Sequence, residues 1–197
     1  MMPKHEITRT DIMDRAAYAA IRAERRRTMT EVKKNRRVSV GPDAAFYFEN
    51  FETMWHQVHE MLYIEKGGED QIADELAAYN PLIPKGRNLA ATFMIQIEDP
   101  ARRARELLRL GGIEETISIS FDGEIVKAVA EGDEERTTEE GKTSSVHFLL
   151  FPFTAKQIEK FKKPGQRVAI AIEHPNYGHM AIVPEAMRAS LAGDFDA

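Results

Sequence analysis

The hydrophobic residues of this chain change their spacing at Leu89, and this change limits the folds open to it. Between Phe51 and Leu62 the apolar residues recur every three or four positions, which predicts an amphipathic helix. From Leu89 to Ile97 they alternate with a period of two, which predicts a strand with one apolar face. The order is helices first, then strands with short helices between them. We therefore expect an α+β fold, with a helical N-terminal part followed by a mostly antiparallel mixed sheet.

Capping and turn residues indicate the other elements. The pair Asp122-Gly123 predicts a two-residue hairpin turn, and Pro81 and Pro84 predict an extended loop over residues 80–88. An acidic surface loop is expected over residues 131–142. Further helices are predicted from Thr10 or Asp11 to Lys34 and over residues 70–79, 100–110, 155–163 and 184–192. Further strands are predicted over residues 38–40, 117–121, 125–130, 146–153, 168–172 and 180–183.

Composition excludes several classes of protein. The chain has 0 Cys, so it has no thiolate metal site, iron–sulfur cluster, disulfide or cysteine nucleophile. It has no glycine-rich phosphate loop and no regular βαβ alternation, which disfavours nucleotide-binding doubly wound folds. No apolar run approaches the roughly 20 residues that span a bilayer, and no secretory signal is seen. These features favour a cytoplasmic protein that has no contact with a membrane.

Charge is distributed unevenly along the 197 residues. Residues 1–40 hold 11 Lys and Arg against 5 Asp and Glu, whereas the remainder holds 16 against 27. We expect a single domain over residues 1–197, with a basic helical arm (1–36) and an α+β body (37–197). The basic arm is open to three interpretations: a solvated helix face, an anion-binding surface, or pairing with the acidic body within a homo-oligomer.

The junction between the first helix and the first strand is the densest group of polar residues. Four cations, a Gly-Pro turn and a Glu-Asn pair occur within 18 residues (33–50). Arginine suits bidentate recognition of carboxylate or phosphate, although structural ion pairs fit the pattern equally well. The residues that we select as candidate ligand-binding groups, here and in the loops, are Arg36, Arg37, Glu49, Asn50, Glu60, Asn80, Arg87, Asn88, His147, His174 and Tyr177.

Two sets of side chains are candidates for a transition metal. His147 interrupts an apolar strand and His174 caps another, so these two with Glu60 form the first set. A histidine bonded to a core carbonyl, and a plain hairpin turn after residue 173, are the alternatives. The weaker set is Glu52, His56 and His59, which align on one flank of the helix over residues 51–65. Its alternative is a polar helix flank with hydrogen-bonded imidazoles.

Several ordered blocks resemble an uncharacterised bacterial family catalogued as a domain of unknown function. They include KNRRVSVGP (34–42), FEN (48–50), EML (60–62), AYNPLIP (78–84), GRNL (86–89), KTSSVHF (142–148) and HP (174–175). The family pattern includes Glu49, Glu60, Asn80, Arg87, His147 and His174, and usually has other residues in place of His56 and His59. The resemblance implies genes that often lie beside those for rubrerythrin and iron–sulfur oxidoreductases. It therefore implies a role in peroxide defence or anaerobic redox metabolism.

Three functions remain open from the sequence. The first is a ligand- or metal-binding accessory protein of a redox system, with or without enzymatic activity, whose expected partners are rubrerythrin or iron–sulfur oxidoreductase proteins. The second is a nucleic-acid-binding or regulatory protein that uses the basic arm, which the acidic body and the 8% aromatic content disfavour. The third is a scaffold that docks a partner protein through its first two helices. We favour the first.

Overall fold

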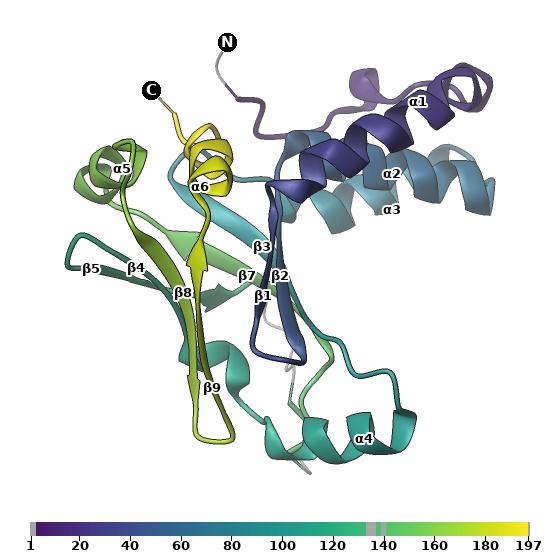
Figure 1. Ribbon diagram of the computed structural model, residues 1–197. Coiled ribbons are helices and arrows are strands. Elements are labelled where there is room, and N and C mark those ends of the chain that lie inside the picture. The colour runs from purple at the N-terminus through teal and green to yellow at the C-terminus, as the bar shows by residue number, and fades with distance from the viewer. Residues whose placement is uncertain (1–2, 133–136, 139–140, 197) are drawn as a thin grey trace.

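The strands form two sheets that face each other across a shared core, as Figure 1 shows. The computed structural model describes residues 3–132, 137–138 and 141–196. The five-stranded sheet has the order β1 (Arg37–Val40), β2 (Ala44–Glu49), β3 (Asn88–Ile95), β7 (Val146–Pro152) and β6 (Val129–Ala130). The four-stranded sheet has the order β5 (Glu124–Lys127), β4 (Ile117–Phe121), β8 (Val168–His174) and β9 (Tyr177–Val183). Each pair of neighbouring strands is antiparallel.

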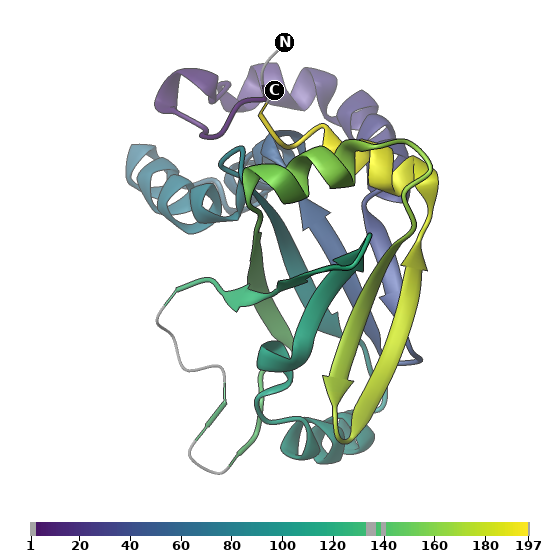
Figure 2. The same cartoon turned by 90° about the vertical axis from the view of Figure 1, so that its left-hand side faces the viewer.

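Helices lie at both ends of the two sheets. In Figures 1 and 2 a layer of three helices and the pair α5 and α6 lie at the upper end, whereas α4 lies at the lower end. The three helices of the layer are α1 (Arg15–Lys34), α2 (Phe51–Glu65) and α3 (Glu69–Tyr79). The other helices are α4 (Pro100–Arg109), α5 (Ala155–Lys162) and α6 (Glu185–Ala192), and the 3₁₀ turns are η1 (Arg9–Asp11), η2 (Asn80–Leu82) and η3 (Ile113–Thr116).

The main core is formed by the inward-facing residues of both sheets. Phe46 and Phe93 on the five-stranded sheet are fully buried, and their ring centroids lie 4.8 Å apart. Ile119 and Ile170 contribute to the same core from the four-stranded sheet. Each fully buried side chain of this size contributes about 1.5–3 kcal/mol to folding. The alternation of the strands therefore accounts for how the two sheets pack.

A second, smaller core holds the helical layer together. The apolar stripe of α2 supplies Met54 and Val58, which pack with Leu82 and Ile83 from the loop before β3. Ile7, from the segment before α1, is 1% exposed in the same cluster. The N-terminal segment is therefore held against α2 and the loop before β3.

The two ends of the chain lie beside each other. Residue 86 forms a parallel bridge with Phe195, and the Asp196 amide donates to the Gly86 carbonyl at 3.0 Å. Gly86 has φ +82°, a left-handed conformation that favours glycine, and a Cβ atom there would also lie 2.1 Å from a carboxylate oxygen of Asp196. The His5 imidazole lies between the two segments, with Nδ1 2.7 Å from the Pro84 carbonyl oxygen and Nε2 2.9 Å from Asp196 Oδ1.

The α+β class, with helices first and an antiparallel sheet arrangement after them, is confirmed. β9 begins at Tyr177, three residues before the predicted strand, and two larger differences have clear physical causes. The expected first helix is interrupted, because Thr8 and Asp11 cap the single turn η1 and the Asp14 carboxylate then accepts two main-chain hydrogen bonds that begin α1 at Arg15. The expected strand over residues 125–130 is divided at Ala128, where the chain passes from one sheet to the other.

Two further points complete the comparison with the predicted elements. β2 was not predicted as a strand of its own, because it is buried on both faces and shows no alternation. The predicted acidic loop over residues 131–142 lies partly outside the described residues. Within the described part of the chain, none of the helices combines the length and apolar character that crossing a bilayer requires.

Candidate functional site

Arg36 lies between α1 and β1, and its side chain is 2% exposed. The guanidinium donates from Nε to the main-chain oxygen of Phe48 at 2.9 Å and from Nη2 to that of Glu49 at 3.0 Å. It also donates to the carboxylate of Asp194, just after α6, and to Ser190 Oγ at 3.3 Å. These partners are needed because burial of an unpaired guanidinium is costly. Arg36 therefore joins the first hairpin to the C-terminal segment.

Glu49 lies on the outer face of the five-stranded sheet, beneath the start of α2, and is 8% exposed. Its carboxylate accepts hydrogen bonds from Thr53 Oγ1 at 2.6 Å and from Thr92 Oγ1 at 2.9 Å. The next residue, Asn50, is the N-cap of α2 and accepts from the Thr53 amide at 3.0 Å. The structure thus brings together Arg36, Glu49 and Asn50, three of the residues selected from the junction.

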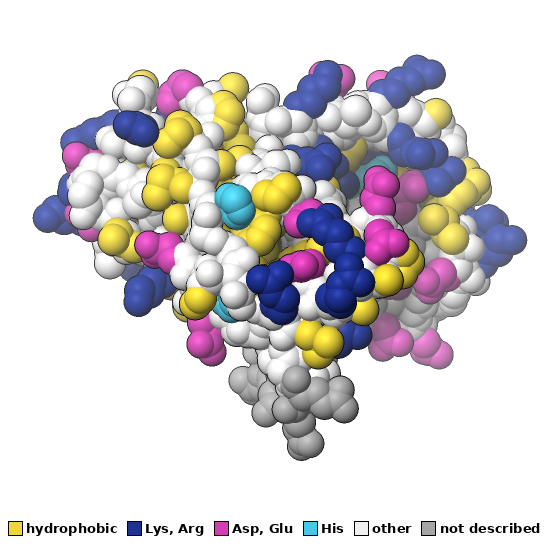
Figure 3. All heavy atoms as spheres, turned by 60° about the horizontal axis from the view of Figure 1, so that its bottom comes forward, with side chains coloured by type: hydrophobic (Ala, Val, Ile, Leu, Met, Phe, Trp, Pro, Cys, Tyr) yellow, Lys and Arg dark blue, Asp and Glu magenta, His cyan; other side chains and the backbone are white. Residues whose placement is uncertain are grey.

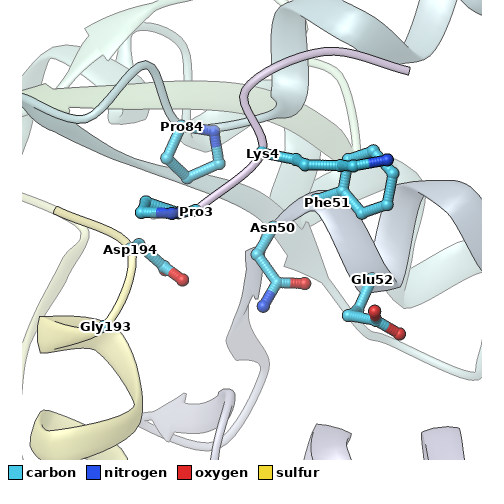
Figure 4. Close-up of a pocket in the computed structure, with 8 residues that line it drawn as sticks. All are labelled: Pro3, Lys4, Asn50, Phe51, Glu52, Pro84, Gly193 and Asp194. Carbon is cyan, nitrogen blue, oxygen red and sulfur yellow. The ribbon is translucent and has the colours of Figure 1, made fainter. Parts of the chain in front are cut away.

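A pocket of about 430 Å³ opens beside this junction. Figure 4 shows the side chains of Asp194 and Asn50 pointing toward each other across its floor. Burial raises the pKa of the Asp194 carboxyl, and contact with Arg36 and with the Asn50 amide opposes that rise. The residues that line the pocket are Pro3, Lys4, Asn50, Phe51, Glu52, Pro84, Gly193 and Asp194.

The rim of the pocket carries one cation over an aromatic ring. The Lys4 ammonium lies 5.0 Å from the centroid of the Phe51 ring (Figure 4). Lys4 also donates to Asp11 Oδ1 at 2.7 Å, and this contact lowers the pKa of the Asp11 carboxyl to about 2. On the other side of the rim, Glu52 accepts a hydrogen bond from Arg25 at 2.7 Å. The pocket therefore has a carboxylate floor, apolar walls and a rim of paired charges.

A second polar cluster lies between α1 and α2. The buried Tyr18 hydroxyl donates to Glu60 Oε1 at 2.9 Å, and Arg22 binds both oxygens of Glu60 at 2.8 Å. His56 Nδ1 lies 3.1 Å from the Tyr18 oxygen and is the donor, because the hydroxyl hydrogen is already committed to Glu60. Hydrogen bonding by Arg22 lowers the pKa of Glu60, whereas burial lowers the pKa of His56 and raises that of Tyr18.

The side chains of the weaker metal set bind separate partners. Both nitrogens of His59 are occupied, since Nε2 accepts from the Met13 amide at 3.0 Å and Nδ1 donates to the Trp55 carbonyl at 2.7 Å. His56 belongs to the tyrosine cluster, and Glu52 binds an arginine of α1. Burial lowers the pKa of His59 as well. Both imidazoles on α2 therefore hold the helices together.

His147 and His174 each bind a main-chain carbonyl group, and the two carbonyl groups belong to different segments. His147 is fully buried, with Nε2 2.9 Å from the Ser144 carbonyl oxygen and Nδ1 3.7 Å from Glu114 Oε2. His174 Nε2 donates to the Gly111 carbonyl at 3.2 Å. Glu60 lies in the helical layer with Arg22 and Tyr18, so the structure does not bring these three side chains together. In the part of the chain that the structure describes, no group of three or more His, Asp or Glu is arranged as metal ligands.

The other selected residues lie apart from the pocket. Arg37 is exposed and donates to Gln96 Oε1 at 3.2 Å, and the exposed Arg87 accepts a hydrogen bond from Phe153 through its main chain. Asn88 closes a turn by accepting from the Lys85 amide at 2.7 Å. Asn80 and Ile7 exchange two hydrogen bonds, at 2.8 and 2.9 Å. The Tyr177 hydroxyl donates to the Val40 carbonyl at 2.8 Å and accepts from the Asp43 amide at 2.9 Å, linking the two sheets.

Sequence reasoning missed the residue at the pocket floor. Asp194 follows the last helix in a short stretch with no periodic pattern, and its partner Arg36 is 158 residues away. Sequence reasoning also missed Tyr18, although a buried tyrosine usually needs a hydrogen-bond partner. This requirement alone could have predicted a polar partner for Tyr18, which the structure shows to be Glu60.

Much of the charge on the basic arm is paired. Arg9, Arg22 and Arg25 bind Glu69, Glu60 and Glu52, and Lys34 binds Glu31. Figure 3 brings the lower end of the molecule, opposite α1, toward the viewer, and on that face Lys and Arg are interspersed with Asp and Glu. These pairs reduce the charge available for phosphate contacts.

Comparison with known proteins gives a family and a related crystal structure. Residues 6–195 match the profile of a family described as "Protein of unknown function (DUF3501)". A crystal structure at 1.90 Å of a novel protein of unknown function from Burkholderia pseudomallei K96243 is similar, with 40% sequence identity and a TM-score of 0.89. The alignment covers 96% of this chain and 99% of the other. Curated protein sequences give no significant match. The match over residues 6–195 shows that the chain belongs to the DUF3501 family.

Proposed function

We propose that this protein binds a small molecule that carries a primary amine, in the pocket between the N-terminal segment, the start of α2 and the C-terminal segment. One observation carries the proposal: the Asp194 carboxylate, 8% exposed, lies at the floor of a pocket of about 430 Å³. Water solvates a carboxylate poorly in such a place. Arg36 pairs with one oxygen of this carboxylate, and a ligand ammonium would bind the other. The pocket is also within the usual size range of small-molecule sites, about 300–1,000 Å³.

The walls of the pocket support an ammonium group with an apolar body. Pro3, Phe51 and Pro84 offer apolar surface, and the Phe51 ring already holds the ammonium of Lys4 at 5.0 Å from its centroid. Arg36 bonds only one oxygen of Asp194, Oδ2. The Asn50 amide also contacts this carboxylate, and the acceptor capacity that remains on the second oxygen would orient the ligand.

The setting that we propose is the cytoplasm of a bacterium, with the protein as an accessory component of a redox or peroxide-defence system. Support for this setting comes from the sequence resemblance, which implies rubrerythrin or iron–sulfur oxidoreductase proteins as partners. The contacts of Glu60, His147 and His174 favour the ligand-binding form of the proposal over the metal-binding form, because each side chain is held by different neighbours.

Calorimetric titration tests the pocket. The probes are short amines such as putrescine, agmatine and phenethylamine, each compared with the alcohol of the same carbon skeleton. We expect at least one amine to bind, and its alcohol to bind about tenfold more weakly or worse, a difference of about 1.4 kcal/mol. Asp194→Asn should weaken the amine by a similar factor, because it removes the charge at the floor.

Two further variants separate loss of the site from loss of the fold. Asp74→Asn changes an exposed carboxylate on α3 and should leave binding unchanged. If Asp194→Asn fails to fold, Phe51→Leu removes the aromatic wall alone and should still weaken the amine. Equal binding of amines and alcohols, or no heat from any probe at about 1 mM, would reject the proposal.

A further inference from the structure

The outer face of the four-stranded sheet has small residues at its centre and large residues at its edges. The registers of β4 with β5 and β8, and of β8 with β9, place these side chains in two rows across the sheet. The central strands contribute Ser118, Ser120, Ala169 and Ala171. The edge strands contribute Ile125 and Lys127 on β5, and Met180 and Ile182 on β9. The face is therefore a groove with a floor of small residues and two walls.

The walls of this groove are apolar and exposed. Ile125 is 64% exposed, Met180 63% and Ile182 48%, which are high values for such side chains. A hollow of about 480 Å³ lies between Ile125 and Ile182, over Ser120 and Ala169. Figure 2, in which this face is toward the viewer, shows α5 above the sheet and α4 below it. In the described part of the chain no helix lies across the groove (Figure 2).

The dimensions of the groove match an α-helix. Three strand spacings, about 14 Å, separate the axes of β5 and β9, from which the wall side chains project. An α-helix with its side chains is about 10–12 Å across. A floor of alanine and serine lets a helix approach closely, and the walls would then contact its sides. An extended strand would fill only part of this width.

The charges at the two ends of the groove differ in sign, which favours one orientation of a bound helix. Arg167 precedes β8 at one end of the floor, and Glu173 lies on the same strand at the other end, about 20 Å away at the usual rise per residue. A helix places a partial positive charge at its N-terminus and a negative one at its C-terminus. Lys127 adds a cation to one wall. None of these three side chains has an ion-pair partner among the described residues, whereas Asp122 and Glu124 nearby both bind Lys160.

We infer that this groove binds an amphipathic helix of a partner protein, of about 13 residues, with its N-terminus toward Glu173. An apolar stripe on the helix covers Ala169 and Ala171, and acidic residues on one flank face Lys127. The binding mode is that of a helix laid in an apolar groove. The groove is separate from the amine pocket, so this inference stands whether or not an amine binds.

Fluorescence polarisation with two labelled, hydrocarbon-stapled helices tests the inference. Both peptides have about 14 residues and the same leucine stripe, and they differ only in a flank of Glu or of Lys. We expect the Glu-flanked helix to bind about tenfold more tightly than the Lys-flanked helix. A nitroxide at the N-terminus of the bound peptide should broaden the amide signal of Glu173 more than that of Arg167.

Three variants complete the test. Ala169→Arg fills the floor and should abolish binding, whereas Ile64→Arg, on an exposed position of α2, should leave it unchanged. Lys127→Glu keeps the groove intact and should reverse the preference between the two flanks. Equal binding of the two helices, or of neither, overturns the inference. So does a dimer of the full chain that Ala169→Arg converts to a monomer, because a second copy would then be the occupant.

Discussion

Loss of the buried Arg36 side chain should lower the stability of the protein substantially. It supplies hydrogen bonds to two main-chain oxygens and the ion-pair partner of the buried Asp194. Removing one member of such a pair leaves an uncompensated charge in the interior, at a cost of about 3–5 kcal/mol. We therefore expect Arg36→Met to lower the free energy of unfolding by this amount in urea titrations.

The neighbouring arginine provides the control for that measurement. Arg37 is exposed and makes one hydrogen bond to Gln96, so Arg37→Met should change stability by no more than about 0.5 kcal/mol. In the double variant Arg36→Met/Asp194→Leu the buried charge is removed with its partner, and part of the loss should be recovered. Equal effects of the two single substitutions would show that burial of Arg36 contributes nothing.

The two buried histidines of α2 should make stability depend on pH. Burial lowers the pKa of His56 and of His59 below the ordinary value of 6.5. Between the folded and unfolded values the unfolded chain binds more protons, so the free energy of unfolding rises with pH in that window. Stability is complete above pH 6.5 and falls as the pH drops toward the folded-state values. We expect thermal melts to show this loss on acidification.

Substitutions assign that pH dependence to particular residues. His59→Gln removes one of the two groups and should flatten the dependence below pH 6.5. His179 is exposed on β9, and His179→Gln should leave the slope unchanged. A slope that is the same in both variants and the unaltered protein would place the titrating groups elsewhere.

Residue types identified polar side chains that make buried contacts, but they did not identify which of these side chains contact one another. The junction over residues 33–50 was identified from its polar density, and Arg36, Glu49 and Asn50 do lie together. The prediction that His147, His174 and Glu60 share one site assumed that they lie close together in space. The strands and the helix that carry these residues place them apart. One sequence does not show which positions far apart along the chain come into contact. The contact between Asp194 and Arg36 could therefore not be predicted.

At the scale of elements, Tyr177 connects the two sheets through one hydroxyl group. Its bonds to Val40 and Asp43 tie β9 to the turn between β1 and β2. Tyr177→Phe would leave a carbonyl and an amide without their partner, which costs about 1–3 kcal/mol when the groups are buried. We expect urea titrations to show this loss. Tyr47→Phe, which removes a hydroxyl bonded only to Gln96 at the surface, should be nearly neutral.

The start of a helix could be predicted from the sequence where a capping residue marks it. The α2 helix begins after Asn50 and α5 after Thr154 because both caps are followed by a reciprocal partner three residues later. The same rule misplaced the start of the first helix, since Thr8 and Asp11 satisfy each other around a single turn. The break at Ala128 depends on pairing with β7, which no local pattern contains.

At the scale of the whole molecule, the chain ends close the proposed pocket. Pro3 and Lys4 line one side and Gly193 and Asp194 another, so the amine pocket exists only when both ends are in place. His5 bridges these ends, since its two ring nitrogens lie 2.7 Å from the Pro84 carbonyl oxygen and 2.9 Å from Asp196 Oδ1. Ligand binding and attachment of the ends should therefore stabilise each other.

Asn80 tests this coupling because it holds the N-terminal segment by two hydrogen bonds to Ile7. In Asn80→Ala both bonds are lost, and the amide of Ile7 should exchange with deuterium about tenfold faster or more, as a loss of about 1.4 kcal/mol in local stability requires. The amine identified by calorimetry should bind more weakly to the same variant, because its pocket loses one wall. Asn176→Ala, which removes one side-chain hydrogen bond to the Arg109 carbonyl in the turn between β8 and β9, should change neither quantity. Unchanged exchange at Ile7 would mean that its burial beneath α2, rather than Asn80, holds the segment, since Ile7 packs there with Val58 and Leu82.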